Sequence, residues 1–396
     1  MNFDGRAGPK GQYESAKCAA DVTSDRAFAS YKENRSSDPP PDLDMLASEI
    51  TVPEPAIPAL NLRALARRLV VPALLAAAAV VGVLLLGGRI HVFADALRRG
   101  LSVSPVWVIV GVAFECASLA GYVALLALVA GRATERVGTR ESAQITFAGA
   151  AATRLLPTAG AGGAALAVYA LRRAGLKPAA AARTLLVFLV LLYSVFLASI
   201  AIAGASLALG LVHGHGPVAL SALPAAGAAV AIVLALVFAT VVGGEAGEPA
   251  ADRSRIEKGV RLVGGAVRDA IALVRSPDRR LIGAAAYWIF DAAVLWAMLH
   301  AFGSPPSLPV VALAYFVGQV ANTLPLPGAV SGGIAGVLIA FGSPAALALP
   351  AVLLYRTIAV WLPLPAGVAA LPGMRATIAR WSREDSGATA TATATA

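Results

Sequence analysis

Long apolar runs, separated by short polar and mostly basic stretches, make up the chain from residue 63 to residue 375. Six of these runs reach the length of about 20 residues that an α-helix needs to cross a bilayer. They are residues 69–88, 105–131, 183–212, 218–242, 281–302 and 345–371. The pattern therefore predicts an all-α, polytopic membrane protein with about six full spans.

Two further apolar segments, residues 143–171 and 308–341, are interrupted by helix-breaking residues. Proline removes a backbone donor and clashes with the preceding turn, and glycine permits backbone angles that other residues resist. Such breaks are tolerated at membrane depth only where protein or a water-filled cavity surrounds them. The residues of the two predicted breaks are Pro157, Gly162, Gly163, Pro325, Pro327, Gly328, Gly332 and Gly333.

The flanking charges predict that both broken segments are re-entrant hairpins, opposed in direction. Basic residues stand on both sides of the first segment, at 132–140 and 172–177, so the positive-inside rule places both of its ends in the cytoplasm. The second segment has no Lys or Arg between residue 281 and Arg356, so we expect it to enter from the outer face. If both segments were full spans instead, the basic residues at 172–183 would lie outside, which disfavours that alternative.

The polar regions outline the domains. Residues 1–62 carry charges of both signs without periodicity, which predicts a disordered cytoplasmic arm. Residues 63–375 form the predicted membrane domain, with repeat one at about 105–212, a cytoplasmic loop at 243–280 and repeat two at about 281–371. Apolar residues recur at helical spacing from 256 to 274, which indicates an amphipathic helix at the membrane surface or a linker helix packed on the bundle. The Ala-Thr tail, 376–396, is predicted to be disordered and cytoplasmic.

Composition supports the membrane class and narrows the function. The chain is 58% hydrophobic, only 14% charged, and has a mean hydropathy of +0.73. Its net charge of +9 lies beside apolar runs, which fits orientation in a membrane rather than nucleic-acid binding. The sequence contains no recognisable nucleophile–base pair, metal cluster or cofactor motif, so it predicts no enzyme, no metal site and no cofactor. The expected location is the bacterial plasma membrane, with both termini in the cytoplasm.

The two broken segments resemble one another, which predicts an inverted-topology repeat. Residues 147–157 match residues 316–325, and the Gly-Gly pairs of the two breaks correspond with a slip of one residue. Each hairpin follows a span that carries one acid and precedes a span that carries an Arg-Thr pair. These matching positions are Glu115 and Asp291 for the acids, and Arg183-Thr184 and Arg356-Thr357 for the pairs.

A specific set of residues carries a family resemblance. It consists of Asp291 in Tyr-Trp-Ile-Phe-Asp, Gln319, Asn322, the Leu-Pro-Leu-Pro-Gly run ending at Gly328, the run 354–363, and Arg154, Pro157 and 160–163 in the first half. Over about residues 65–375 the chain resembles the transmembrane region of lysylphosphatidylglycerol synthases and of related YbhN-type membrane proteins. The resemblance implies a flippase that moves an aminoacylated or other lipid across the bacterial membrane, without the soluble synthase domain. The family often has Glu after the second break, where this chain has Ile334.

Four charged residues lie within the predicted membrane segments: Glu115, Arg154, Asp291 and Arg356. Each costs about 2.5–3.5 kcal/mol at a helix centre, so we expect them to face a partner or a wet cavity. Buried salt bridges that fix helix packing are one interpretation, and direct contact with a lipid is the other. Arg154 is the preferred phosphate ligand, because a guanidinium grips phosphate bidentately and the half-helix that follows offers free amides. Asp291 is expected to bind a cationic head group or to carry a proton.

Polar and small residues near the second break complete the candidate site. Gln319 and Asn322 are three apart and are expected to cap the broken backbone or to contact the substrate, because unpaired amides are costly in hydrocarbon. Gly328, Gly332 and Gly336 form a small-xxx-small series that predicts close helix packing.

The preferred function is a lipid translocase that moves a phospholipid or a polyprenyl-phosphate-linked lipid by alternating exposure of a central cavity. Two alternatives stay open. One is a non-transporting scaffold or accessory subunit of an envelope glycosyltransferase, and the other is an ion-coupled transporter of small solutes. The expected partners are membrane lipid and, for the scaffold, enzymes of envelope biosynthesis.

Overall fold

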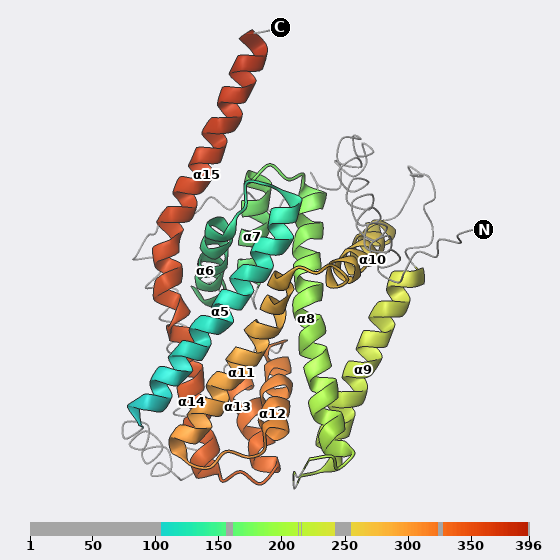
Figure 1. The fold of residues 1–396 in the computed structure, drawn as a ribbon, viewed down its shortest axis with the longest axis vertical. Helices are drawn as coiled ribbons and strands as arrows, with labels where there is room; N and C mark the ends of the chain where they lie inside the picture. Colours follow the sequence, from blue (N-terminus) through green and yellow to red (C-terminus); the bar gives the residue numbers. More distant parts are fainter. Residues whose placement is uncertain are drawn as a thin grey trace, which may run out of the picture. The chain divides into compact units, whose positions relative to one another are not determined.

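The computed structural model describes residues 104–155, 161–212, 214, 216–241, 255–323 and 328–394, and all of them fall in one compact unit. Figure 1 shows the described part as an assembly of helices. The elements are α5 (Pro105–Ala133), α6 (Thr139–Leu155), α7 (Ala161–Arg173), α8 (Pro178–Ala208), α9 (Val218–Val241), α10 (Arg255–Val274), η1 (Arg279–Leu281), α11 (Ile282–Phe302), α12 (Leu308–Val320), η2 (Ala321–Thr323), α13 (Ala329–Ala340), α14 (Ala345–Trp361) and α15 (Pro363–Ala394).

The described residues contain five helical segments that are long and apolar enough to cross a membrane: Pro105–Ala133, Pro178–Ala208, Val218–Val241, Arg279–Phe302 and Ala345–Gly387. Each overlaps one predicted span, so the all-α, multi-span class is confirmed. The predicted arm at 1–62 and the first predicted span at 69–88 lie outside the described residues.

α5 and α11 form an antiparallel pair in very close contact. Gly111, near the start of α5, lies against Met298 near the end of α11, whereas Gly121 lies against Gly283 near its start. A Cβ placed on Gly121 would come within 2.8 Å of the carbonyl oxygen of Gly283, so neither backbone tolerates a side chain here. The Ser118 hydroxyl adds a hydrogen bond of 2.8 Å to the carbonyl oxygen of Tyr287. Small residues of this kind allow helices to pack closely where apolar burial gives no drive for association.

Helices α6 and α7 form a hairpin, which we call hairpin one. Its closed end is fixed by the Gly163 amide, which donates to the Thr153 hydroxyl at 3.1 Å. Its open end is fixed by the Thr134 hydroxyl, which donates to the carbonyl oxygen of Ala174 at 3.2 Å. With 17 and 13 residues, the helices are about 26 and 20 Å long at 1.5 Å per residue. Both are shorter than the hydrocarbon core of a bilayer, which is about 30 Å thick.

Helices α12 and α13 form hairpin two. At the crossing, Gly318 of α12 lies against Ile334 of α13, and a Cβ on Gly333 would be 3.1 Å from the Gly318 Cα. At the open end, Val310 and Phe341 both lie beside Gly214. α13 begins after Gly328, whose φ of +79° is a left-handed conformation that glycine adopts without strain.

The two hairpins are built alike, which confirms the internal similarity seen in the sequence. Gly149 is the eleventh residue of α6 and Gly318 the eleventh of α12, and each faces a glycine of the returning helix. Both returning helices end in the same cap, with a positive φ at Gly175 (+93°) or Gly342 (+88°) and an amide one residue later that bonds back to Leu171 or Leu338.

One expected element of the repeat is wrong. Arg183 is the sixth residue of α8, whereas Arg356 is the twelfth of α14, so the two Arg-Thr pairs are not equivalent. Arg183 lies instead at the end of the bundle, where it binds Asp269 of α10 through two hydrogen bonds of 2.7 and 2.9 Å.

The hairpins open at opposite ends of the α5–α11 pair. Hairpin one opens where α5 ends and α11 begins, since Arg132 of α5 contacts Asp278, just before η1, at 3.6 Å. Hairpin two opens where α11 ends, and there Gly303 lies against Leu347 of α14. Figure 1 shows this arrangement, with α6 and α7 toward the top and α12 and α13 toward the bottom.

Charged residues gather where hairpin one opens. The ion pairs there are Arg132–Asp278 at 3.6 Å, Arg136–Asp385 at 2.5 Å and Arg380–Glu141 at 3.3 Å. The hydrogen bonds that Arg280 donates hold the pKa of the Asp278 carboxyl below its usual range. These pairs are partly exposed and contribute little to stability. Together they mark this end as the basic end of the bundle.

The C-terminal region differs from the prediction. Instead of one span at 345–371 and a disordered tail, α14 ends at Trp361 and α15 continues from Pro363 to Ala394. A proline starts the second helix because its fixed φ suits the first helical position. α15 packs along α6: Gly367 lies against Ala151, Thr377 donates to Gln144 at 2.9 Å, and Met374 and Trp381 are buried. These contacts explain why the helix extends past residue 376.

The helix predicted near residues 256–274 is present as α10. Its small residues, including Gly265 and Ala266, are buried and the helix packs on α8, as the linker interpretation requires. Val260, Val263 and Val274 remain exposed.

The predicted role of Gly328, Gly332 and Gly336 is wrong. No atom of the described residues lies within 4 Å of a Cβ built on any of these three, because α13 turns Val330 and Ile334 toward its partners. The close approach is made by Gly333, one residue away.

We predict that Gly318→Ala destabilises the protein by about 1–3 kcal/mol, because the new methyl group collides with the backbone of Ile334. The control Gly336→Ala enters open space in the facing helix and should be neutral or stabilising, by up to about 1 kcal/mol, because alanine favours helix. Thermal unfolding of the two purified variants in one detergent measures the difference. Equal melting temperatures would show that the glycine crossing does not hold the hairpin.

Candidate functional site

Asp291 lies near the middle of α11 with only 7% of its surface exposed. Its Oδ2 atom accepts a hydrogen bond of 2.5 Å from the Tyr315 hydroxyl, and the Tyr355 hydroxyl lies 3.5 Å from the same oxygen. Both tyrosines are completely buried. When the acceptor is ionised such a hydrogen bond is stronger than a neutral one, so this contact is a strong link between α11 and α12 whenever Asp291 carries its charge.

The cluster ties together three helices. Gln319 of α12 donates from Nε2 to the Tyr355 hydroxyl at 3.0 Å, so the chain of contacts runs from α11 to α12 and on to α14. Asp291, Tyr315, Gln319 and Tyr355 form what we call the polar cluster. Because α12 is the first arm of hairpin two, the cluster ties this hairpin to the spans on either side of it.

Two further charges act on the polar cluster. Glu115 of α5 is 4% exposed and lies on the α5 face that meets α11, between Gly111 and Ser118. The charges of Glu115, Asp291 and Arg356 all act on the Tyr355 hydroxyl. The first two also act on Tyr287. The structure thus brings together three of the four predicted membrane charges, one from each of α5, α11 and α14.

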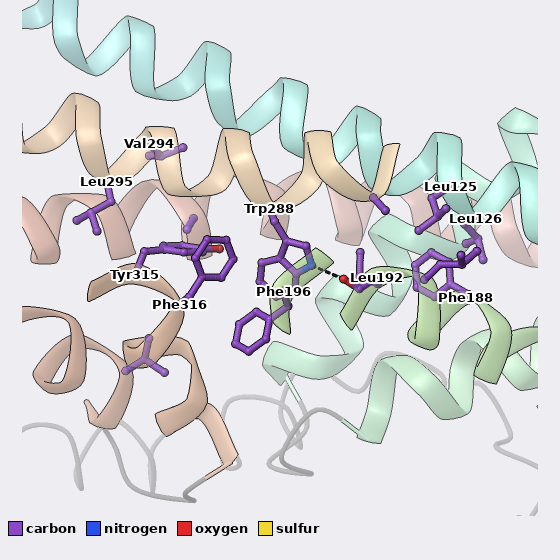
Figure 2. Packing of buried hydrophobic residues seen from close by; sticks show 14 of the residues in the cluster. Leu125, Leu126, Phe188, Leu192, Phe196, Trp288, Val294, Leu295, Tyr315 and Phe316 are labelled. Atoms are coloured by element: carbon purple, nitrogen blue, oxygen red, sulfur yellow. Dashed lines mark hydrogen bonds between the residues drawn. The ribbon is translucent and has the colours of Figure 1, made fainter. Parts of the chain in front are cut away.

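An aromatic core supports the cluster from the side of α8 (Figure 2). Trp288, one turn before Asp291, is 6% exposed and donates from its indole nitrogen to the carbonyl oxygen of Leu192 at 2.8 Å. Its ring contacts those of Phe196 and Phe316, at centroid distances of 4.9 and 5.9 Å. Phe316 in turn stands edge-on to Tyr315 at 4.8 Å. This packing fixes the direction in which Tyr315 points. It also makes Trp288 a packing residue.

Repeat one carries the same scaffold without the tyrosine hydroxyls and the glutamine amide of the polar cluster. Tyr315 is the eighth residue of α12, and the eighth residue of α6 is Thr146. Tyr355 is the eleventh residue of α14, and the eleventh of α8 is Phe188, which is equally buried. Ala150 stands at the position of Gln319. Only the acid is kept, as Glu115. The polar cluster is therefore specific to repeat two.

Several predicted site residues fall elsewhere. Asn322 lies in η2 and is exposed, so it does not join Gln319 at the cluster. Gly162 and Gly163 lie in the first turn of α7, at the closed end of hairpin one. Ile334, which replaces the family Glu, is fully buried against Gly318 and serves the hairpin crossing. Pro157, Pro325, Pro327 and the side chain of Arg154 lie outside the described residues; Arg154 itself is the second-last residue of α6.

Sequence reasoning missed Tyr315 and Tyr355. Each carried a local signal. Tyr315 is four residues before Gln319, which puts both on one face of a helix, and Tyr355 directly precedes Arg356 in the family-like run. Tyr315 and Tyr355 contact Asp291, from which they are 24 and 64 residues distant in the sequence. A single sequence does not reveal such contacts between helices.

The fold and the site define a multi-pass α-helical membrane protein with two opposed helical hairpins and buried acids at the crossing of its two repeats. A family model described as the lysylphosphatidylglycerol synthase TM region matches residues 70–367. The chain belongs to this family, as its motifs indicated. No curated protein is matched by the chain.

We predict that Tyr355→Phe keeps the protein folded, with a loss of about 0.5–1.5 kcal/mol for the hydrogen bonds, because repeat one is stable with Phe188 at the matching position. The reverse change, Phe188→Tyr, places a hydroxyl among apolar residues and should cost more, about 1–3 kcal/mol. Denaturation in detergent, followed by tryptophan fluorescence, compares the two. A larger loss for Tyr355→Phe would mean that the polar cluster holds the fold.

Proposed function

We propose that this protein is a lipid translocase of the bacterial plasma membrane, which moves a phosphate-bearing lipid by exposing a central site to one face and then to the other. The observation that carries the proposal is the pair of hairpins opening at opposite ends of the α5–α11 pair, with Glu115 and Asp291 buried at the crossing. Opposed, broken elements around a central site are the arrangement by which many transporters alternate access.

Family membership supports the same class. The match to the transmembrane region of lysylphosphatidylglycerol synthase covers 70–367, which includes both hairpins. The resemblance implies a flippase, and it rests on residues at the site described here, among them Asp291 and Gln319.

In the proposed orientation the basic end of the bundle faces the cytoplasm. Short cytoplasmic segments carry an excess of Lys and Arg, and residues such as Arg132, Arg136 and Arg380 gather at this end. Hairpin one would then be re-entrant from the cytoplasm and hairpin two from the outside, since the arms of both are too short to cross the bilayer.

Two guanidinium groups in the membrane segments would bind the lipid phosphate. Arg154 lies next to the break of hairpin one, and Arg356 is half-buried in α14 beside Tyr355. Guanidinium binds phosphate through paired hydrogen bonds and stays charged in an apolar environment, which lysine does less well. The neighbouring acids would keep the site from holding the anion too tightly.

Proteoliposomes test the proposal. Purified protein is reconstituted with fluorescent phospholipids, and the label exposed on the outer leaflet is reduced chemically over time. We predict that Arg154→Gln slows lipid movement roughly tenfold to a hundredfold, because a charge-assisted hydrogen bond is worth about 1.5–3 kcal/mol. The matched control, Arg136→Gln, removes the same charge from an exposed ion pair with Asp385 and should retain the wild-type rate.

Two results count against the proposal. Wild-type protein that moves no labelled phospholipid or polyprenyl phosphate is not a translocase for this class, and a glycosyltransferase that co-purifies with it would favour the scaffold. If Arg154→Gln and Arg136→Gln behave alike, Arg154 is not the phosphate ligand.

A further inference from the structure

The internal repeat separates what the fold needs from what the polar cluster adds. Repeat one has the same glycine crossing and the same helix cap as repeat two. At the positions of Tyr315, Gln319 and Tyr355 it has Thr146, Ala150 and Phe188. The same packing is therefore achieved without the tyrosine hydroxyls and the amide. Two buried tyrosines directed at one carboxylate, and a glutamine that donates to one of these tyrosines, serve something other than helix packing.

We propose that Asp291 is a proton-binding site, which takes up and releases one proton during each transport cycle. This inference deepens the proposed function and rests on it for its place in a cycle. In the step itself a proton adds to the Asp291 carboxylate from water and later returns to water, so no other bond forms or breaks.

Geometry favours a proton over a cationic head group. The Oδ2 atom of Asp291 already accepts the Tyr315 hydroxyl at 2.5 Å and has the Tyr355 hydroxyl at 3.5 Å. Both tyrosines are completely buried, so an ammonium group would have to displace packed aromatic side chains to reach this oxygen. A proton requires no such space.

Protonation would loosen hairpin two. An ionised carboxylate accepts hydrogen bonds about twice as strong as those of a neutral acceptor, so adding a proton weakens the Tyr315–Asp291 bond. This bond joins α12 directly to α11, and the second contact chain, through Gln319 and Tyr355, joins α12 to α14. Release of the proton restores the stronger tie. The charge state of one residue would thus bias the hairpin between a held and a released position.

Charged and titratable groups approach Asp291 from each neighbouring helix. The groups are Glu115 from α5, Tyr315 from α12, Tyr355 and Arg356 from α14, and Tyr287 from α11 itself. On the side of α8, Tyr193 lies against Trp288, and η1 carries Arg279 and Arg280 at the far start of α11. Glu115 and Arg356 thus place one further negative and one positive charge in the same region as Asp291.

Infrared difference spectroscopy on the lipid-reconstituted protein tests the inference directly. Spectra are recorded between alkaline and acidic buffer, and the carbonyl band of a buried carboxylic acid is identified by its shift in heavy water. We expect wild type to gain such a band on acidification and Asp291→Asn to lose it. Glu115→Gln, which removes the other buried acid, should keep the band.

A second variant protects the test if Asp291→Asn fails to fold. Tyr315→Phe removes the hydroxyl that bonds Asp291, so the acid carbonyl band should move to higher frequency, as it does when a carbonyl loses a donor. The control Tyr169→Phe alters a tyrosine of hairpin one that contacts Arg173, and it should leave the band in place. A wild-type protein without a titrating band, or a band that neither Asp291→Asn nor Tyr315→Phe changes, overturns the proposal.

The spectra also distinguish this inference from the proposed function. If the Asp291 band titrates while no lipid moves in proteoliposomes, the proton site stands and the lipid translocase is wrong. If lipid moves while no band titrates, the translocase stands and the proton site is wrong.

Discussion

The close contact of α5 with α11 determines most of what the described part of the molecule can do. Gly121 and Gly283 bring the two backbones together, and Gly111 admits the side chain of Met298 at the other end of the pair. In lipid, apolar burial gives no drive for helices to associate, so packing of this closeness has to supply it. Because the pair is antiparallel, the hairpin that follows each helix opens at the opposite end. One contact therefore sets both the cohesion of the repeats and their opposed directions.

The two arms of each hairpin are also held together by close packing at glycine residues. A helix too short to cross the bilayer is stable only if its partner covers it closely, and the glycine crossings at Gly149–Gly163 and Gly318–Gly333 provide that contact. Ile334 contributes to the second crossing, because its buried branched side chain lies against Gly318.

The sequence predicted where the helices lie better than it predicted which face of each helix contacts its neighbours. Apolar length and Pro-Gly breaks placed the described spans and both hairpins within a few residues, except at the C-terminal end of the last span. The breaks did not reveal which glycine meets the partner helix, and Gly332 was expected where Gly333 makes the contact. The predicted last span ended at residue 371, whereas α15 continues to Ala394. The polar second half of α15 is held by contacts with α6, such as Thr377–Gln144, which no local sequence pattern shows. The acids were found because charge in hydrocarbon is rare, whereas Tyr315 and Tyr355 look like ordinary apolar packing until the helices are assembled.

Comparison of repeat one with repeat two shows which residues belong to the shared fold and which belong to the polar cluster alone. The two repeats share the same packing. A group that is present in only one repeat is therefore not needed for that packing. By this criterion the glycine crossings and the capped helix ends belong to the fold. Tyr315, Gln319 and Tyr355 do not: the tyrosines are fully buried, Gln319 is partly buried, and their hydrogen bonds link α11, α12 and α14. Glu115 and Asp291 occupy matching positions: each repeat keeps its acid at the crossing, and Asp291 accepts hydrogen bonds from the Tyr315 and Tyr355 hydroxyls.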